Sequence, residues 1–510
     1  MSWQVRLDGT GLGGTRPTDE NLLPEMVMKR LPVLVFLLLS AACAPPTPEQ
    51  QVIDDAAEAL GGASKIQNLK TLTIQGTGSA PNAGQNRTPD EELPVWRVNE
   101  FTRTIDLANS RMRAQQVRQA QFLFAGDLVQ RQTQGIDGDA AYTVSPKGTV
   151  TRAGGTAARD RRIELLHHPV TVLRTILDAD DVTLNNLKAK AGERLVDVTM
   201  PGGEAFMLAI DAKTHLPTRV VSMVDNPNMG DVAIETRFAD YEDVDGLKLP
   251  RRLTTKMDQY PQFDLQVSKN AVDGDATALA ISAELKKAPV PDPPPVVVTV
   301  EPVATGIWWL AGSGNHRSVV FEFDDHLVLF EAPVNEPRTK AVIDKARTLS
   351  SKPLTKVIVS HHHFDHSGGL RTAIAEGLTI VTHRSNETFF KALVARQHLI
   401  APDALEKNHR QATFEFMDDK LTLKDKSMEV QLYYLLDNPR EGTNIYAYVP
   451  RDRILVQADL YDATWLRHSW GENVLQNLAK RGLNPEKSVP VHGVVEPFDQ
   501  MVRNIRSKPS

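Results

Sequence analysis

The chain has 510 residues, of which 41% are hydrophobic and 24% are charged, and this is typical of a globular protein with enough apolar side chains for two to four domains. It contains 58 Lys and Arg residues against 64 Asp and Glu residues, so its formal net charge is only -6. This balance provides neither a basic surface for nucleic acid nor an acidic tail, and we expect no nucleic-acid partner.

The N-terminal segment has the order of features found in bacterial export signals. Lys29 and Arg30 precede an apolar run at residues 31–39, and small residues then lead to Cys43, the one cysteine of the chain. The apolar run is too short to cross a membrane as a helix. The segment resembles a bacterial lipoprotein signal, which implies that Cys43 carries a lipid and becomes the mature N-terminus. An uncleaved anchor and an ordinary signal peptide are the alternatives.

Residues 1–43 are therefore interpreted as an upstream extension followed by a lipoprotein-type signal peptide, with Met26 or Met28 as the expected start of translation. The lipid would anchor the protein in the cell envelope, facing the periplasm or the exterior. A mature chain without a second cysteine forms no internal disulfide, so its stability must come from packing.

Residues 50–285 are predicted to form a β-rich domain. The segment "VIDDAAEALGG" indicates a short amphipathic helix, and from Thr71 onward many short runs alternate between apolar and polar residues. Such runs predict a large, curved antiparallel sheet. The succession "ALGG…TLTIQGTG…FADYEDVDGLKLPRRL" resembles the half-barrel sheets of periplasmic lipoprotein-carrier-like domains, which implies a site for apolar ligands. His167 and His168 lie on one helical segment with no partner cluster nearby, so we interpret them as structural.

A linker is predicted at residues 286–296, where five prolines lie between Ala288 and Pro295. Beyond it, residues 297–510 begin with paired strands and continue with strands separated by helices, the latter expected over 336–350, 387–398 and near 472–481. This order predicts an α/β domain with a two-sheet core covered by helices on both sides.

The segment "VIVSHHHFDHSGGL", residues 357–370, contains four histidines and an aspartate directly after a buried strand. His361 and His363 are two residues apart and can point the same way from an extended segment. Asp365 and His366 follow a turn and can converge on a second point nearby. Imidazole and carboxylate ligands suit Zn²⁺ or Fe, and two such ions can share a bridging hydroxide. A histidine-rich surface loop is the alternative, but the strand before and the Gly-Gly-helix after favour metal binding.

The stretch "SHHHFDHSGG" resembles the signature of the metallo-β-lactamase superfamily, an αββα sandwich of metal-dependent hydrolases, and the resemblance covers about residues 296–510. The strand "RILVQADL" is similar to the one that ends in the family's bridging aspartate, and "VPVHG" to the one that ends in its last ligand. His362 is expected to face away from the metals, and Asp365 to orient the nucleophile as a catalytic residue. The resemblance implies one or two Zn²⁺ ions, with Fe as an alternative, and these ligands: His361, His363, Asp365, His366, Asp459 and His492.

One position departs from the family pattern. A histidine ligand is expected about ten residues before Pro450, and counting back places Arg440 there. A guanidinium stays protonated and has no lone pair to donate. We therefore expect Arg440 to act as a fixed cation in the first metal site or toward an anionic substrate group, leaving about one tightly bound metal per chain. Asp437 is an alternative ligand, and His383 and His409 are further alternatives.

Together these features predict an exported, lipid-anchored metal-dependent hydrolase. A metal-bound hydroxide would attack a small-molecule ester, lactone, thioester, lactam or phosphoester. Two alternatives remain open: a non-catalytic metal- or ligand-binding lipoprotein, and a di-iron redox protein. Metal analysis separates the redox protein from the hydrolase, and a substrate panel with and without a chelator separates the hydrolase from the binding protein.

Overall fold

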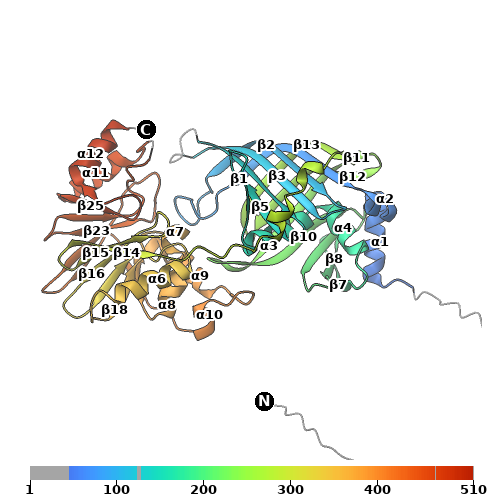
Figure 1. The fold of residues 1–510 in the computed structure, drawn as a ribbon. Helices are drawn as coiled ribbons and strands as arrows, with labels where there is room; N and C mark the ends of the chain where they lie inside the picture. Colours follow the sequence, from blue (N-terminus) through green and yellow to red (C-terminus); the bar gives the residue numbers. More distant parts are fainter. Residues whose placement is uncertain (1–44, 123–127, 466, 509–510) are drawn as a thin grey trace, which may run out of the picture. The chain divides into compact units, whose positions relative to one another are not determined.

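The computed structural model describes residues 45–122, 128–465 and 467–508, which form an α/β structure with three sheets (Figure 1). Residues 46–510 are one compact unit. The predicted signal segment, including Cys43, lies outside the described residues. Within the described ranges, no helix is both long enough and apolar enough to span a bilayer.

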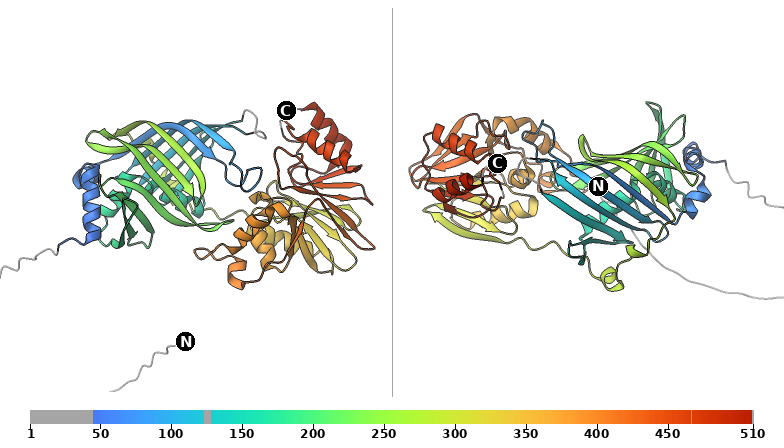
Figure 2. Two further views of the ribbon diagram at one scale, coloured as in Figure 1. Left: turned by 180° about the vertical axis from the view of Figure 1, so that it is seen from behind. Right: turned by 90° about the horizontal axis from the view of Figure 1, so that it is seen from above.

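The first sheet has thirteen antiparallel strands in the order β6-β5-β4-β3-β2-β1-β13-β12-β11-β10-β9-β8-β7, and the views in Figure 2 show that it is strongly curved. Alternate side chains such as Leu72 and Ile74 are buried, because successive residues of a strand point to opposite faces. Its strands are β1 (Thr71–Pro81), β2 (Val95–Asp106), β3 (Arg111–Ala120), β4 (Val129–Asp137), β5 (Ala140–Val144), β6 (Val150–Arg152), β7 (Thr183–Lys190), β8 (Glu193–Thr199), β9 (Ala205–Asp211), β10 (Pro217–Asn226), β11 (Gly230–Val244), β12 (Leu247–Met257) and β13 (Tyr260–Val272).

Helices cover the buried face of this sheet. The side chain of Thr47 caps the first of them by accepting a hydrogen bond from the Gln50 N–H, and Gly61 ends it with φ 134°. Val52 and Ile53 of this helix share one apolar core with the strands. The helices of this part are α1 (Pro48–Leu60), α2 (Ala63–Asn68), α3 (Gly155–Leu166), α4 (Pro169–Leu177), η2 (Thr277–Leu279) and α5 (Ala283–Lys287).

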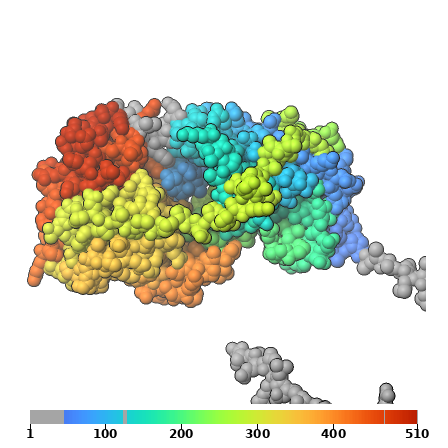
Figure 3. Space-filling view, in the orientation of Figure 1, coloured from blue at the N-terminus to red at the C-terminus, as the bar shows by residue number. Residues whose placement is uncertain are grey.

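The proline-rich segment joins α5 to β14. Residues 289–296 are all exposed, and Figure 3 shows this part of the chain, in yellow-green, crossing the molecular surface. Prolines suit such a segment because they fix an extended backbone that has few hydrogen-bond donors to satisfy. The domain boundaries drawn from the sequence stay a prediction.

The remaining chain forms two sheets, ordered β14-β15-β16-β17-β18-β19-β20 and β21-β22-β23-β24-β25-β26. Strands β17 to β20 are parallel to one another, as are β24 and β25. The strands are β14 (Val298–Ala304), β15 (Ile307–Gly312), β16 (Ser318–Glu322), β17 (Leu327–Phe330), β18 (Leu354–Ile358), β19 (Thr379–His383), β20 (Phe414–Met417), β21 (Lys420–Lys424), β22 (Glu429–Tyr434), β23 (Ile445–Val449), β24 (Ile454–Gln457), β25 (Lys487–Pro490) and β26 (Glu496–Pro497).

Buried side chains lie on both faces of these sheets. Val319 and Phe321 of β16 belong to a core that also contains residues of β22 to β25, whereas Val320 between them belongs to a core with α6, α8 and α9. A further core contains residues of β22 to β24, α11 and α12. The helices are α6 (Glu336–Arg347), α7 (Phe364–Ser367), α8 (Leu370–Ala375), η3 (Arg384–Asn386), α9 (Glu387–Ala395), α10 (Ala404–Asn408), α11 (Gly471–Lys480) and α12 (Phe498–Ser507).

Candidate metal centre

The histidine stretch leaves the carboxyl end of β18, which lies between the parallel neighbours β17 and β19. The chain runs through residues 359–363 without regular structure and then enters the short helix α7. His361, His363 and His366 are completely buried there. Ligands commonly gather at such strand ends in α/β sheets, because loops rather than helices surround them.

Two groups of ligand-type side chains meet at this place and share one aspartate. The first group is His361, His363, Glu441 and Asp459, and the second is Asp365, His366, Asp459 and His492; within each group the ligand atoms lie within 4.8 Å of one another. Asp459 follows β24 and His492 follows β25, so side chains from the ends of strands in both smaller sheets converge. All six residues predicted as ligands from the sequence therefore come together.

Glu441 is the member that the sequence prediction missed. The count from Pro450 selected its neighbour Arg440, but the fully buried Glu441 carboxylate is the one that joins the first group. A count across a loop is uncertain by a residue, so the acidic neighbour was a signal that could have been used. Asp437 does not belong to either group, nor do His383, which stacks on Tyr434 at 4.0 Å, and His409, which ends α10.

The Arg440 guanidinium contacts three members of the first group. Its Nε lies 3.1 Å from Glu441 Oε1, and its Nη2 lies 3.3 Å from His363 Nδ1 and 3.6 Å from Asp459 Oδ2. Arg440 is 7% exposed. A permanent cation thus lies against atoms that a metal ion in the first group would also use.

The donor set fits a divalent metal. His361 Nε2 and Glu441 Oε2 are buried without a hydrogen-bond partner, while Glu441 Oε1 lies 3.1 Å from Arg440 Nε. A buried polar atom that nothing satisfies costs about 1–3 kcal/mol. In the second group, His366 Nε2 and His492 Nε2 lie 3.1 Å and 3.0 Å from Asp459 Oδ1. Imidazole nitrogens and carboxylate oxygens gathered in this way are the ligands that Zn²⁺ and Fe prefer.

Partners outside the two groups orient the histidines. His361 Nδ1 lies 2.9 Å from Ser360 Oγ, and His492 Nδ1 donates to the Asn315 carbonyl at 2.5 Å. His366 Nδ1 faces the buried Glu331 carboxylate at 3.4 Å. Such second contacts fix the tautomer and ring orientation of metal-binding histidines.

The histidines of the two groups differ in their protonation. Burial lowers the pKa of His361 and His363 well below the usual histidine value, which keeps their lone pairs free. Burial also lowers the pKa of His366 and His492, but the nearby Asp365 and Asp459 carboxylates outweigh it: the pKa of His366 is raised well above its usual value and that of His492 to about 9. A metal entering the second group must therefore displace protons.

His362 belongs to neither group. Its Nδ1 lies 3.1 Å from Thr443 Oγ1, and its Nε2 lies 3.3 Å from Asn86 Oδ1. Of the second group, Asp365 is the most accessible member, with 26% of its side chain exposed. A reacting molecule would therefore approach on the Asp365 side of the site.

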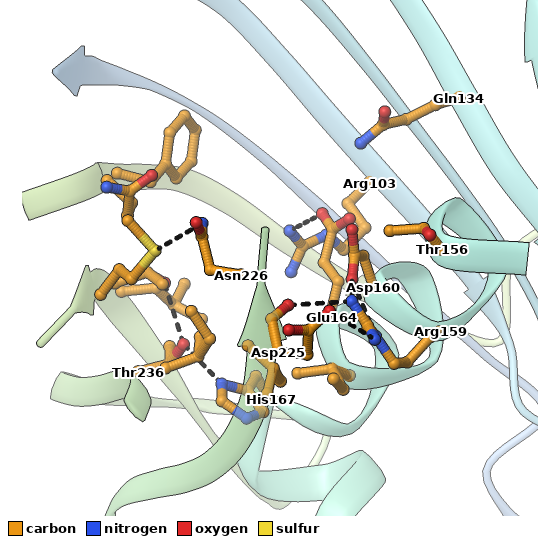
Figure 4. Close-up of a pocket in the computed structure, with 18 of the residues that line it drawn as sticks. Arg103, Gln134, Thr156, Arg159, Asp160, Glu164, His167, Asp225, Asn226 and Thr236 are labelled. Carbon is orange, nitrogen blue, oxygen red and sulfur yellow. Dashed lines mark hydrogen bonds and ion pairs between the residues drawn. The ribbon is translucent and has the colours of Figure 1, made fainter. Parts of the chain in front are cut away.

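A separate cavity of about 490 Å³ lies in the thirteen-stranded sheet against α3 (Figure 4). Its apolar side chains come from strands β10 to β13 and from α3, and they include Ile163, Leu253 and Phe263. Its arginines are paired with acidic residues: Arg103 with Glu164, and Arg159 with Asp160 and Asp225. The cavity therefore combines an apolar wall with arginines that are paired with carboxylates.

Comparisons with known proteins find similarity to metallo-beta-lactamases. Residues 311–403 match the family model of the metallo-beta-lactamase superfamily. The "Metallo-beta-lactamase type 2" of Bacillus cereus is 24% identical over 192 residues, which are 35% of this chain and 67% of that protein. A metallo-beta-lactamase structure from Pontibacter korlensis is 15% identical with a TM-score of 0.34, covering 41% of this chain and 98% of that one. FIM-1 from Pseudomonas aeruginosa in its mono-zinc form is 14% identical with a TM-score of 0.34, covering 42% and 96%.

Proposed function

Because residues 311–403 match the family model of the metallo-beta-lactamase superfamily, we propose that this protein is an exported metal-dependent hydrolase of small molecules. The observation that carries the proposal is the pair of ligand groups that share Asp459. We also assign the two smaller sheets to an αββα sandwich, since their buried faces form one core between them and cores with helices on the outside.

Zn²⁺ held by these groups would act as a Lewis acid and would lower the pKa of water so that it becomes a nucleophile at neutral pH. His361, His363 and Glu441 would hold the first position, while His366 and His492 would hold the second with Asp365. The same donor set suits iron, so metal analysis of the purified protein also tests the di-iron redox alternative.

Asp365 is the catalytic residue of this proposal. It is a metal ligand with an exposed edge, and His316 Nε2 and His492 Nε2 lie 3.6 Å and 3.5 Å from its Oδ2. Burial raises the pKa of the Asp365 carboxyl, but the charge of His366 and hydrogen bonds from these histidines bring it well below the usual value. An ionised carboxylate here can accept a hydrogen bond from the attacking water and orient it.

The substrate is a small molecule with an electrophilic carbonyl or phosphoryl centre: an ester, lactone, thioester, lactam or phosphoester. The names of the relatives make β-lactams one class to include. The full chain should be assayed against this panel as purified, after chelation, and after Zn²⁺ is returned. We expect hydrolysis of at least one class that is lost on chelation and restored by Zn²⁺, and not restored in His366→Ala. Chelator-insensitive hydrolysis, or none on the whole panel, would refute the proposal.

The cavity in the thirteen-stranded sheet supports the second candidate, a ligand-binding protein. Since its arginines are already paired with carboxylates, it suits a neutral amphiphile better than an anion. Monodecanoylglycerol and decanoate have similar chains and differ in charge, so their binding can be compared by calorimetry. We expect tighter binding of the neutral probe and its loss in Leu253→Trp, whose bulk fills the cavity, while His366→Ala binds normally. Equal binding of both probes, or no effect of Leu253→Trp, would remove this candidate.

The proposed location is the cell envelope, through a lipid on Cys43. The support is the order of basic, apolar and small residues before that cysteine. Mass spectrometry of membrane-extracted protein should find an acylated peptide that begins at Cys43. An unmodified N-terminus at another residue would refute the anchor while leaving the proposed hydrolase untouched.

A further inference from the structure

The loop between β1 and β2, residues 82–94, reaches the metal centre although it belongs to the thirteen-stranded sheet. Consecutive residues of this β1–β2 loop make close contacts there. Gly84 has φ +72°, and a Cβ at this position would lie 2.7 Å from the Phe364 ring. The Arg87 carbonyl accepts a hydrogen bond of 2.8 Å from the Gly442 N–H. The loop therefore fits between the helix after the histidines and the segment that carries Glu441.

Gln85 connects the loop to both groups of ligands. Its side-chain Oε1 accepts a hydrogen bond of 2.6 Å from Arg440 Nη2, and its main-chain carbonyl accepts one of 2.9 Å from Nη1. Its Nε2 donates to Asp365 Oδ1 at 3.3 Å. One side chain thus holds the cation of the first group and a carboxylate of the second.

Asn86 determines which nitrogen of His363 is protonated. The Asn86 main-chain carbonyl lies 2.8 Å from His363 Nε2, and since a carbonyl only accepts, that nitrogen must carry the hydrogen. The lone pair is then on Nδ1, which lies 3.3 Å from Glu441 Oε1 and faces the first group. This is the tautomer that a metal in the first group requires.

The loop has a defined conformation of its own. Asn86 is 4% exposed, and its Nδ2 donates to the carbonyls of Thr88 and Glu91 at 2.5 Å and 3.2 Å. At the base, the Asn82 N–H donates to the Pro94 carbonyl at 2.8 Å. These bonds present the Asn86 carbonyl and the Gln85 side chain in fixed positions.

We propose that the β1–β2 loop is a component of the metal centre, in which Asn86 and Gln85 are positioning residues for His363 and Arg440. Metal binding in the first group then depends on the N-terminal sheet, which lies outside the matched residues 311–403. The inference rests on the metal centre of the proposed function but not on its being a hydrolase.

The test uses the full chain with two variants that disturb the loop. Gly84→Ala pushes the loop away from Phe364, and Asn86→Ala removes the bonds that hold its turn. Glu92→Ala changes an exposed side chain of the same loop and is the matched control. Zinc stoichiometry is measured by elemental analysis, affinity by competition with a chromophoric chelator, and folding of the metal-free proteins by thermal denaturation.

We expect both loop variants to bind the zinc ion of the first group (the first zinc) about 10- to 100-fold more weakly, the usual loss when an outer partner of a metal ligand is removed. The affinity for the zinc ion of the second group (the second zinc) should stay the same in these variants, and Glu92→Ala should leave both affinities unchanged. Gln85→Ala should change the affinity for the zinc ion of the first group when Arg440 is present. In an Arg440→Ala background the same substitution should change that affinity much less, because Gln85 acts largely through Arg440.

Unchanged or tighter zinc binding in both loop variants would overturn the inference and show that the loop only covers the site. Equal weakening of both zincs would overturn it too, since that indicates general damage. If the unmodified chain hydrolyses substrates and the loop variants bind zinc normally, the proposed function stands and the inference fails. If the loop variants lose the first zinc but the unmodified chain hydrolyses nothing, the inference about the loop stands and the proposed function fails.

Discussion

Two clusters of buried histidines in this chain have different neighbours. In the N-terminal sheet, His167 Nδ1 lies 2.9 Å from Thr236 Oγ1 and its Nε2 lies 2.9 Å from Ser222 Oγ, so hydroxyls satisfy the whole ring. In the C-terminal half, His361 Nδ1 lies 2.9 Å from Ser360 Oγ. Its buried Nε2 has no hydrogen-bond partner and faces carboxylates. Burial alone therefore does not distinguish His167 from His361; the Glu441 and Asp459 carboxylates that face Nε2 of His361 do.

The same difference appears in protonation. Burial lowers the pKa of His167 to about 4. His492 is similarly buried, yet the Asp459 charge and hydrogen bonds with Asp365 and Asp459 outweigh burial and raise its pKa to about 9. The His167 ring is thus neutral because burial disfavours its charged form, and the His492 ring holds a proton that a metal can replace.

The largest expected effect is on metal content when a ligand is removed. His366→Ala should abolish tight binding in the second group. The binding free energy of a structural zinc site with four ligands is about 10–16 kcal/mol. One ligand therefore accounts for about 3 kcal/mol or more, and its loss should lower the zinc affinity by over 100-fold. Elemental analysis checks this, with His167→Gln as the control from the other cluster. Zinc loss in His167→Gln would contradict the distinction between the clusters.

The second effect is on stability at acid pH. The native state keeps His167 neutral down to about pH 4, whereas the unfolded chain takes up the proton near pH 6.5. This contribution to stability is therefore present above pH 6.5 and falls by about 3 kcal/mol as the pH drops to 4. Urea unfolding of the metal-free protein at pH 7 and pH 4.5 measures the loss. His167→Gln should reduce this loss of unfolding free energy. An identical pH dependence in that variant would show that other groups cause the loss.

Two substitutions in the first group should act in opposite directions. Arg440→His removes a fixed cation, which at 4 Å and an effective dielectric of 20 repels a unit charge by about 4 kcal/mol. It should tighten the first zinc by more than about tenfold and increase hydrolysis. Glu441→Gln removes a negative ligand and should weaken the first zinc by about tenfold or more. Zinc competition titrations measure both, and a tighter first zinc in Glu441→Gln would show that this carboxylate is not a ligand.

The smallest effect, counted per pH unit, is the pH dependence of zinc binding in the second group. His492 holds a proton below about pH 9 in the metal-free protein, and zinc must displace it. Displacement of the His492 proton alone should raise the apparent affinity about tenfold per pH unit from pH 7 to pH 9, and displacement of the His366 proton adds to this rise. In the metal-free chain, the stabilisation from this raised pKa is present below pH 6.5 and is lost as the pH rises through 9. A flat zinc affinity between pH 7 and 9 would show that His492 is already neutral.

Local patterns in the sequence predicted much of the fold. The apolar and polar alternation from Thr71 onward predicted strands that the structure contains, and the helices expected over 336–350 and near 472–481 correspond to α6 and α11. The edge strand β7 was missed, because most of its residues are exposed and its sequence "TLNNLKAK" has no sustained alternation. Its pairing with β8 decides its conformation instead.

The sequence by itself pointed to six residues that the structure brings together, because they lie in short stretches that follow strands with a local, readable apolar pattern. Only the tertiary structure decided that Glu441 joins them beside Arg440, that Thr236 and Ser222 satisfy His167, and that the β1–β2 loop reaches the metal centre. Asn86 and His363 are 277 residues apart in the chain. Contacts over such a distance depend on how whole sheets pack, and no short stretch of sequence contains that information.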